Sequence, residues 1–129
     1  MIYYTDSCII MDNNKRACFA LVVATLVNKK RYSYVFDYRQ GKHISISSSS
    51  VDQRNLSFFD YNRGGAVTGD KNGMFDHVSG SHVSLSISGK NVGCFDFQTN
   101  THLTFTVNRD SVEVFDFETN EYYQYTVNH

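Results

Sequence analysis

A short phrase of Phe, Asp and a second ring-bearing residue occurs five times in this chain, and no other feature restricts the fold as strongly. The copies begin at Phe36, Phe59, Phe75, Phe95 and Phe115, and in each one a Gly or an Asn stands four residues after the Asp. Gly and Asn tolerate a positive φ angle better than other residues. Each copy therefore predicts a tight turn closed by a left-handed residue, at Asp spacings of 23, 16, 20 and 20 residues.

The residues after each turn predict a β-strand that returns alongside the first. In the last copy, Tyr123, Tyr125 and Val127 alternate with Gln124 and Thr126. This period of two is typical of a strand with one buried face. The first, third and fourth copies alternate in the same way, and short polar links join the later copies. Short links favour pairing between neighbouring strands, so we predict an antiparallel meander of hairpins.

The register of each hairpin follows from the expected turn. We predict a three-residue turn in which the left-handed residue forms a bulge. In the last copy this turn places Asp116 opposite Tyr122 and Phe115 opposite Tyr123. One face of the sheet then collects the Phe before each Asp, the ring after it and the apolar residues of the returning strand. These side chains form the predicted core, where burial of each one contributes ~1.5–3 kcal/mol.

The predicted fold class is all-β, with a single domain over residues 1–129. Phe, Tyr, Val, Ser and Thr are abundant, whereas only three Glu and four Ala occur, which favours strands over helices. Residues 32–128 are expected to form the meander of about five degenerate hairpin repeats, and the whole chain about eleven strands. Because a sheet of that size rarely stays flat, we predict that it rolls into a barrel or folds into two packed sheets.

Residues 1–31 are predicted to hold a lead-in and one long hydrophobic strand. Residues 17–27 are apolar at nearly every position, and periodicity alone does not separate a buried strand from a buried helix there. Asp12 as an N-cap favours a helix, while the β-branched Val22 and Val23 favour a strand. We predict a strand buried on both faces. As a helix the segment is too short to span a bilayer of ~30 Å, so no membrane association is expected.

The predicted register also brings Asp and His together in three hairpins, as facing pairs on the polar side of the sheet. These six candidates for ligand binding are Asp37, His43, Asp76, His82, Asp96 and His102. Equivalent pairs in successive hairpins would lie roughly 10 Å apart, and each pair supplies two ligands where a metal typically needs three or four. We therefore expect cross-strand ion pairs worth roughly 0.2–1 kcal/mol each, and neither a metal nor a cofactor.

Other catalytic chemistry has little support in the sequence. Cys18 and Cys94 lie in apolar segments and are predicted to pack inside, whereas Cys8 is expected to be exposed. An odd and sparse set of Cys does not indicate a disulfide framework. No Gly-x-Ser-x-Gly elbow occurs, and the glycine-rich residues 64–69 lack the Lys-Ser/Thr ending of a phosphate loop. The protein is therefore expected not to be an enzyme.

The net charge and the N-terminal residues indicate which partners and which location to expect. The chain has 12 basic and 13 acidic residues, a net charge of −1. This balance gives no electrostatic footprint for nucleic acid or for an anionic membrane. The first residues show no basic region followed by a long apolar one, so no signal peptide is predicted and the cytoplasm is the expected location.

These observations favour a non-catalytic binding or assembly protein that presents repeated polar hairpin faces to an unknown protein or carbohydrate. Exposed sheet edges would also permit a homo-oligomer. The absence of Trp, together with the placement of Phe and Tyr in the core, disfavours carbohydrate as the ligand. The alternative from another class is a small hydrolase or metal-dependent enzyme that uses an Asp–His pair.

The repeated phrase resembles the YD repeats of large bacterial shell and toxin proteins, which also run as successive hairpins. The resemblance covers residues 35–128 at most. Those repeats usually place Gly three residues after the Asp and continue with Arg-Leu. Here the Gly or Asn comes four residues after the Asp and Arg-Leu is absent, so we assign no family on this ground.

Overall fold

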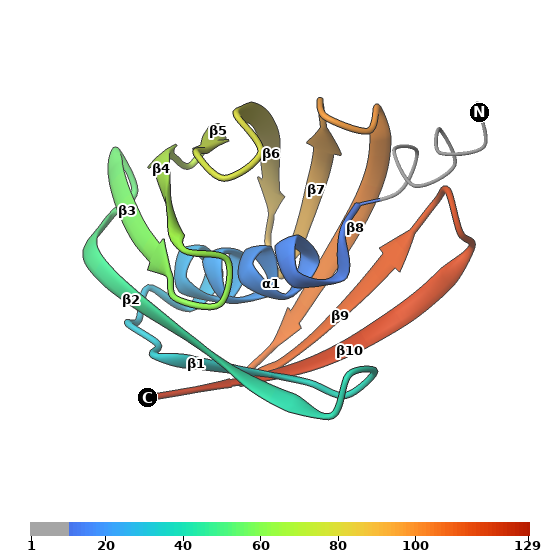
Figure 1. Ribbon diagram of the computed structural model, residues 1–129, viewed down its shortest axis with the longest axis horizontal. Helices are drawn as coiled ribbons and strands as arrows, with labels where there is room; N and C mark the ends of the chain where they lie inside the picture. Colours follow the sequence, from blue (N-terminus) through green and yellow to red (C-terminus); the bar gives the residue numbers. More distant parts are fainter. Residues whose placement is uncertain (1–10) are drawn as a thin grey trace.

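A closed barrel of ten antiparallel strands surrounds one helix in the computed structural model, which describes residues 11–129 (Figure 1). The helix, α1, spans Asn13–Asn28. The strands are β1 Tyr34–Asp37, β2 Lys42–Asp52, β3 Asn55–Asp60, β4 Gly65–Asp70, β5 Gly73–Asp76, β6 Ser81–Ser88, β7 Asn91–Asp96, β8 Thr101–Asn108, β9 Ser111–Asp116 and β10 Glu121–Asn128. The predicted antiparallel meander is confirmed, and it forms a barrel.

The strands follow one another around the barrel in chain order, and β10 pairs with β1 to close it. Each of the ten described strands therefore has a paired neighbour on both sides. Closure removes the unpaired edges that an open sheet would expose. The ten described strands therefore offer no edge strand for the predicted self-association through open sheet edges.

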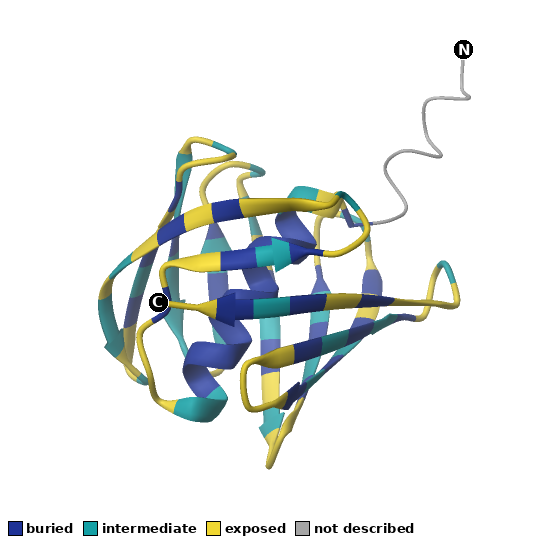
Figure 2. Ribbon diagram, turned by 90° about the horizontal axis from the view of Figure 1, so that it is seen from below, coloured by how far each residue is buried: buried dark blue, intermediate teal, exposed yellow. Residues whose placement is uncertain are grey.

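Residues 17–27 form the middle of α1, so the predicted long strand is wrong. Asp12 is the N-cap: its carboxylate accepts hydrogen bonds from the backbone amides of Asn14 (3.0 Å) and Lys15 (3.2 Å). Every residue from Lys15 to Leu26 is buried, as Figure 2 shows for the helix inside its ring of strands. A segment that is apolar on all sides suits a helix that the barrel encloses completely.

No helix within residues 11–129 has the length and apolar character that crossing a membrane requires. The buried positions of Cys18 and Cys94 confirm that both side chains pack inside the barrel. Cys8, predicted to be exposed, lies outside the residues that the structure describes.

Each repeated turn contains four residues between the paired strand ends, not three. In the last hairpin, Asp116 pairs with Glu121 and Phe115 pairs with Tyr122. A register shift of one residue moves a side chain to the opposite face of the sheet. The Asp side chains therefore point into the barrel, and the Phe side chains before them point out. The predicted placement of these Phe, and of the ring after each Asp, in the core is wrong, whereas Tyr123 and the other apolar residues of the returning strands lie inside as predicted.

The left-handed residue that closes each turn is confirmed in all five hairpins, with φ between 56° and 74°. These residues are Gly41, Gly64, Gly80, Asn100 and Asn120. The backbone amide of each one donates a hydrogen bond of 2.7–2.8 Å to the carbonyl of the repeated Asp four residues earlier. The Asp side chains support the turn as well, since Asp116 accepts a hydrogen bond of 2.8 Å from the amide of Glu118.

Gly80→Val is expected to lower the free energy of unfolding by ~1–2 kcal/mol, because a branched residue is strained in the left-handed conformation. A Cβ at Gly80 would meet no atom within 4 Å, so the cost is backbone strain and not a clash. Gly80→Asn is the matched control, since Asn holds the equivalent position in two other hairpins. Urea unfolding of both variants checks the prediction, which an unchanged stability of the Val variant would contradict.

Candidate binding site

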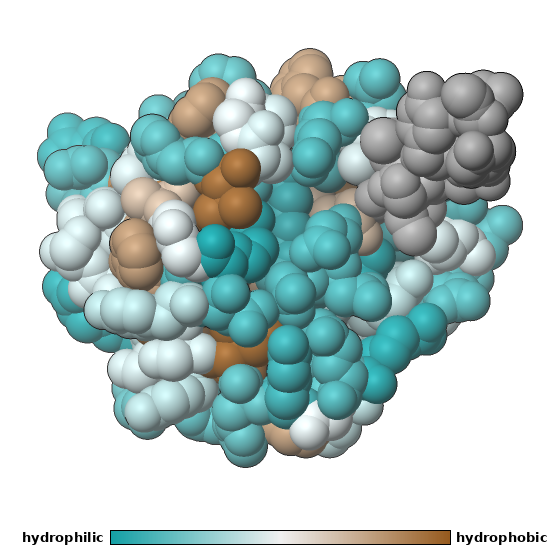
Figure 3. All heavy atoms as spheres, in the orientation of Figure 1, coloured by the Kyte–Doolittle hydropathy of each residue, from teal (hydrophilic) through white to brown (hydrophobic). Residues whose placement is uncertain are grey.

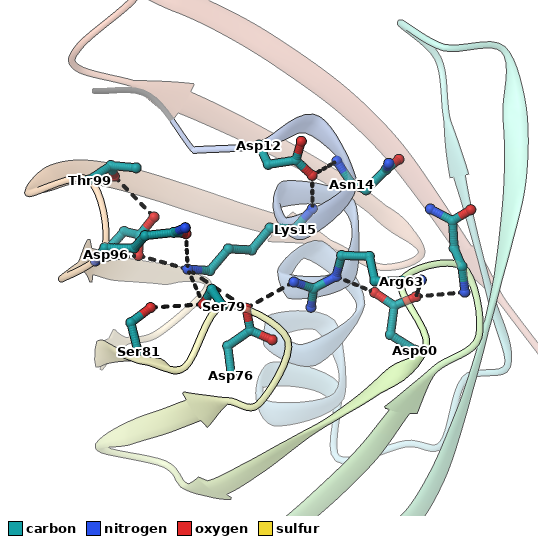
Figure 4. Close-up of polar contacts among 12 residues, drawn as sticks. Asp12, Asn14, Lys15, Asp60, Arg63, Asp76, Ser79, Ser81, Asp96 and Thr99 are labelled. Atoms are coloured by element: carbon teal, nitrogen blue, oxygen red, sulfur yellow. Dashed lines mark hydrogen bonds and ion pairs between the residues drawn. The ribbon is translucent and has the colours of Figure 1, made fainter. Parts of the chain in front are cut away.

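The five repeated Asp side chains gather inside one end of the barrel, which we call the aspartate end. They are Asp37, Asp60, Asp76, Asp96 and Asp116, each at most 1% exposed. Each one ends an odd-numbered strand. Because odd-numbered strands of a meander run in the same direction, their last residues meet at the same end. The first turn of α1 also lies there, and Figure 4 shows Lys15 reaching toward two of these carboxylates.

Alternating charges connect α1 to three of the turns. The Lys15 Nζ atom lies 2.9 Å from an oxygen of Asp96 and 3.8 Å from one of Asp76. Arg63, from the turn between β3 and β4, lies 2.7 Å from Asp60 and 2.9 Å from Asp76. Asp76 therefore sits between two cations. These buried ion pairs anchor the first turn of the helix to the turns of the barrel.

The electrostatics of this cluster keep Asp76 and Arg63 charged. Burial by itself raises the pKa of the Asp76 carboxyl, but hydrogen bonds from Arg63 and Ser79, with the charges of Arg63 and Lys15, outweigh burial and hold that pKa below its ordinary value. Burial lowers the pKa of the Arg63 guanidinium, whereas its hydrogen bonds to Asp76 and Asp60 raise it by more. Asp76 and Arg63 are thus a stable ion pair at neutral pH.

Arg16 completes the cluster on the other side of the helix. Its guanidinium lies 3.6 Å from a carboxylate oxygen of Asp116 and 3.8 Å from the centre of the Tyr123 ring, which is a cation–π contact. Sequence reasoning missed Lys15, Arg16 and Arg63. The first two carried a signal, because cations in the first turn of a helix oppose its dipole and call for carboxylate partners nearby.

The predicted facing pairs of Asp and His are wrong. The three His pair instead with the Phe before each Asp, as Phe36–His43, Phe75–His82 and Phe95–His102. These His are exposed on the outside of the barrel, while Asp37, Asp76 and Asp96 are inside it. Their rings lie 4.7–4.8 Å from the partner Phe rings. Within residues 11–129, no group of three or more His, Cys, Asp or Glu is arranged to hold a metal ion.

The Phe before each Asp and the ring after it, which were expected in the core, instead lie with exposed His and Tyr rings in a belt around the outside of the aspartate end. We call this set the aromatic belt: Phe36, Tyr38, His43, Phe59, Tyr61, Phe75, His77, His82, Phe95, Phe97, His102, Phe115, Phe117 and Tyr122. Neighbouring rings within a hairpin stand 4.7–5.0 Å apart. The exposed fractions of Phe97, Phe117 and Tyr122 are 54%, 56% and 60%. Most of the face seen in Figure 3 is hydrophilic, with separate hydrophobic patches.

The rings after each Asp are held over the preceding hairpin by hydrogen bonds. The backbone amide of Phe117 donates to the carbonyl of His102 at 3.1 Å, and the amide of Phe97 donates to the carbonyl of His82 at 3.1 Å. The hydroxyl of Tyr38 forms a hydrogen bond of 2.9 Å with the hydroxyl of Thr126. These hydrogen bonds fix the backbone next to the rings against the neighbouring strand.

A hollow with a volume of about 550 Å³ opens beside the belt, over β6, β7 and β8. Its floor is the row Ser86–Gly93–Thr104, three residues paired across the three strands. Phe95, His102 and Phe117 form its aromatic wall. A second hollow of about 400 Å³ lies over β8, β9 and β10 and shares Thr104 and Phe117 with the first. The two hollows are neighbours, with the Phe117 ring between them.

No protein-family model matches this chain, and neither the curated proteins nor the solved structures include a significant match to it.

Proposed function

We propose that this chain is a non-catalytic binding protein that attaches to carbohydrate through the aromatic belt on the outside of its barrel. The observation that carries the proposal is the exposure of rings such as Phe97, Phe117 and Tyr122, each more than half accessible. Apolar rings that gather on a surface mark a site that binds a ligand or a partner.

The chemistry beside the belt supports a sugar in particular. Sugar rings present apolar C–H faces and hydroxyl edges. The belt offers aromatic faces for the former, while Ser84, Ser86 and Thr104 offer hydroxyls that donate and accept hydrogen bonds for the latter. Placement of the rings in the core was the main argument against carbohydrate, and the outward position of the belt removes it. Five similar hairpins also suit a ligand that repeats along its length.

The Asp–His alternative is disfavoured by the same geometry. Acid–base catalysis requires the two groups within hydrogen-bond reach of one substrate. The three candidate Asp side chains are inside the barrel and the three candidate His side chains are outside, so the wall of the barrel separates them.

An array of neutral and charged glycans tests the proposal. Phe117→Ala and Tyr122→Ala are each expected to weaken glycan binding by about tenfold or more, equivalent to about 1.4 kcal/mol. Tyr34→Ala is the matched control, since it removes a ring that is 42% exposed but lies outside the belt. A failure of every glycan to bind would overturn the proposal. Binding that survives both belt substitutions would also overturn it, because the site would then lie elsewhere.

A further inference from the structure

We infer that the hollow over Gly93 is the principal sugar subsite and that it takes one ring of a neutral oligosaccharide, a specific claim that rests on the proposed function. The size, lining and glycine floor of this hollow each support the inference. The second hollow, beyond Phe117, provides room for the next ring of the same ligand.

The hollow stays open because Gly93 has no side chain. Residues two positions before the repeated Phe occupy the same place in the five hairpins, and they are Tyr34, Ser57, Gly73, Gly93 and Glu113. In the last hairpin that place carries the Glu113 side chain, whose carboxylate accepts a hydrogen bond of 2.8 Å from the side-chain amide of Gln124 across the strands. At Gly93 the corresponding space has no side chain.

The backbone does not require a glycine at this position. Gly93 is not one of the glycines with a positive φ angle. A Cβ placed on it would approach Ser86 no closer than 3.9 Å, which is ordinary van der Waals contact. Glycine in the interior of a strand weakens the strand and often marks a place where a ligand approaches the backbone. The residue therefore costs some stability and leaves an open floor between Ser86 and Thr104.

The lining of the hollow favours a ligand without charge. Among the residues that the structure describes, none of those lining it is Asp, Glu, Lys or Arg. An ionic ligand would lose hydration on entering, and no carboxylate, ammonium or guanidinium group of the lining would compensate that loss. Ser84, Ser86 and Thr104 offer hydroxyls on the floor, and Phe95 and Phe117 offer rings at the side. A pyranose ring fits this combination, with its C–H face on the rings and its hydroxyls on the floor.

The test uses ¹⁵N-labelled protein and hexasaccharides of glucose, mannose, xylose and N-acetylglucosamine as neutral probes, with hexagalacturonate as the charged probe. A neutral hexasaccharide that binds is expected to shift the amide signals of Gly93, Ser86 and Thr104. Gly93→Val, whose branched side chain fills the hollow, is expected to weaken binding by about tenfold or more. Its melting temperature should equal or exceed that of the wild type, because Val favours strands.

Gly73→Val is the matched control, since it adds the same side chain at the equivalent position of the neighbouring hairpin, where a Cβ would approach other atoms no closer than 3.4 Å. It should leave binding unchanged. Full binding by Gly93→Val, or amide shifts confined to other parts of the belt, would overturn this subsite while the proposed function stands. Equal binding of hexagalacturonate would overturn the neutral class. If no saccharide binds at all, the proposed function itself fails. The amide shifts of the wild type decide the matter even if a variant does not fold.

Discussion

Replacement of Lys15 by Ala is expected to lower the free energy of unfolding by ~3–5 kcal/mol, because removal of one partner leaves a buried charge without compensation. Lys15 and its partner carboxylates on Asp76 and Asp96 are at most 1% exposed. Asp76 keeps its ion pair with Arg63 in the variant, whereas Asp96 loses its closest cation. Urea unfolding at neutral pH, followed by circular dichroism, measures the effect.

The matched control for this change is Arg39→Ala. Arg39 forms an ion pair of 2.8 Å with Glu121, but both side chains are about half exposed. Ion pairs in contact with water contribute at most ~1 kcal/mol. If Lys15→Ala costs no more than Arg39→Ala, the interior cluster does not anchor the helix. In the double variant Lys15→Ala with Asp96→Ala, the loss of unfolding free energy should be smaller than the sum of the losses in the two single variants, because the two residues share one interaction.

Phe19→Ala is expected to cost a similar amount, ~3–5 kcal/mol, through lost burial and the cavity left behind. Phe19 lies in α1 at 0% exposure. The surrounding wall is held by strand pairing all the way round, so it has little freedom to collapse into the space. The measurement is again urea unfolding, with thermal melting as a second observation.

Benzene shows whether the loss of stability comes from a cavity, because an apolar cavity of this kind stays dry and binds benzene. Benzene should raise the melting temperature of the Phe19→Ala variant and leave that of the wild type unchanged. Tyr34→Ala, which removes an exposed ring from a strand, serves as control and should cost less than about 1 kcal/mol. A loss for Phe19→Ala as small as that of Tyr34→Ala would mean that the helix is loosely packed.

Local features of the fold could be predicted from the sequence, because neighbouring residues determine them. The left-handed Gly and Asn fixed the position of every repeated turn, and the alternation around Tyr123 and Tyr125 fixed which side of each returning strand is buried. The meander followed from the short links. The register did not follow, since a left-handed residue four positions after the Asp suits both a three-residue and a four-residue turn.

The two main errors supported each other. The predicted three-residue turn placed the repeated Phe on the core face, and the strand predicted for residues 17–27 left no helix to fill the interior. Once α1 fills the interior, rings such as Phe95 and Phe115 can lie outside, and the inward position of the Asp is compensated by Lys15, Arg16 and Arg63. Contacts between a helix and five distant turns are tertiary, and no local pattern predicts them. The hollow over Gly93 was missed for the same reason, because it depends on which face Gly93 and Phe95 occupy.

Because the barrel encloses α1, we expect the helix and the strands to fold in a particular order. Helix α1 precedes every strand in the chain and has no polar face. Its apolar side chains therefore remain in contact with water until the strands enclose them. The seam between Val35 and Val127 joins the two extremes of the meander, and such long-range pairing is slow. We therefore expect the pairing of β1 with β10 to form last, after the other strands have packed around the helix.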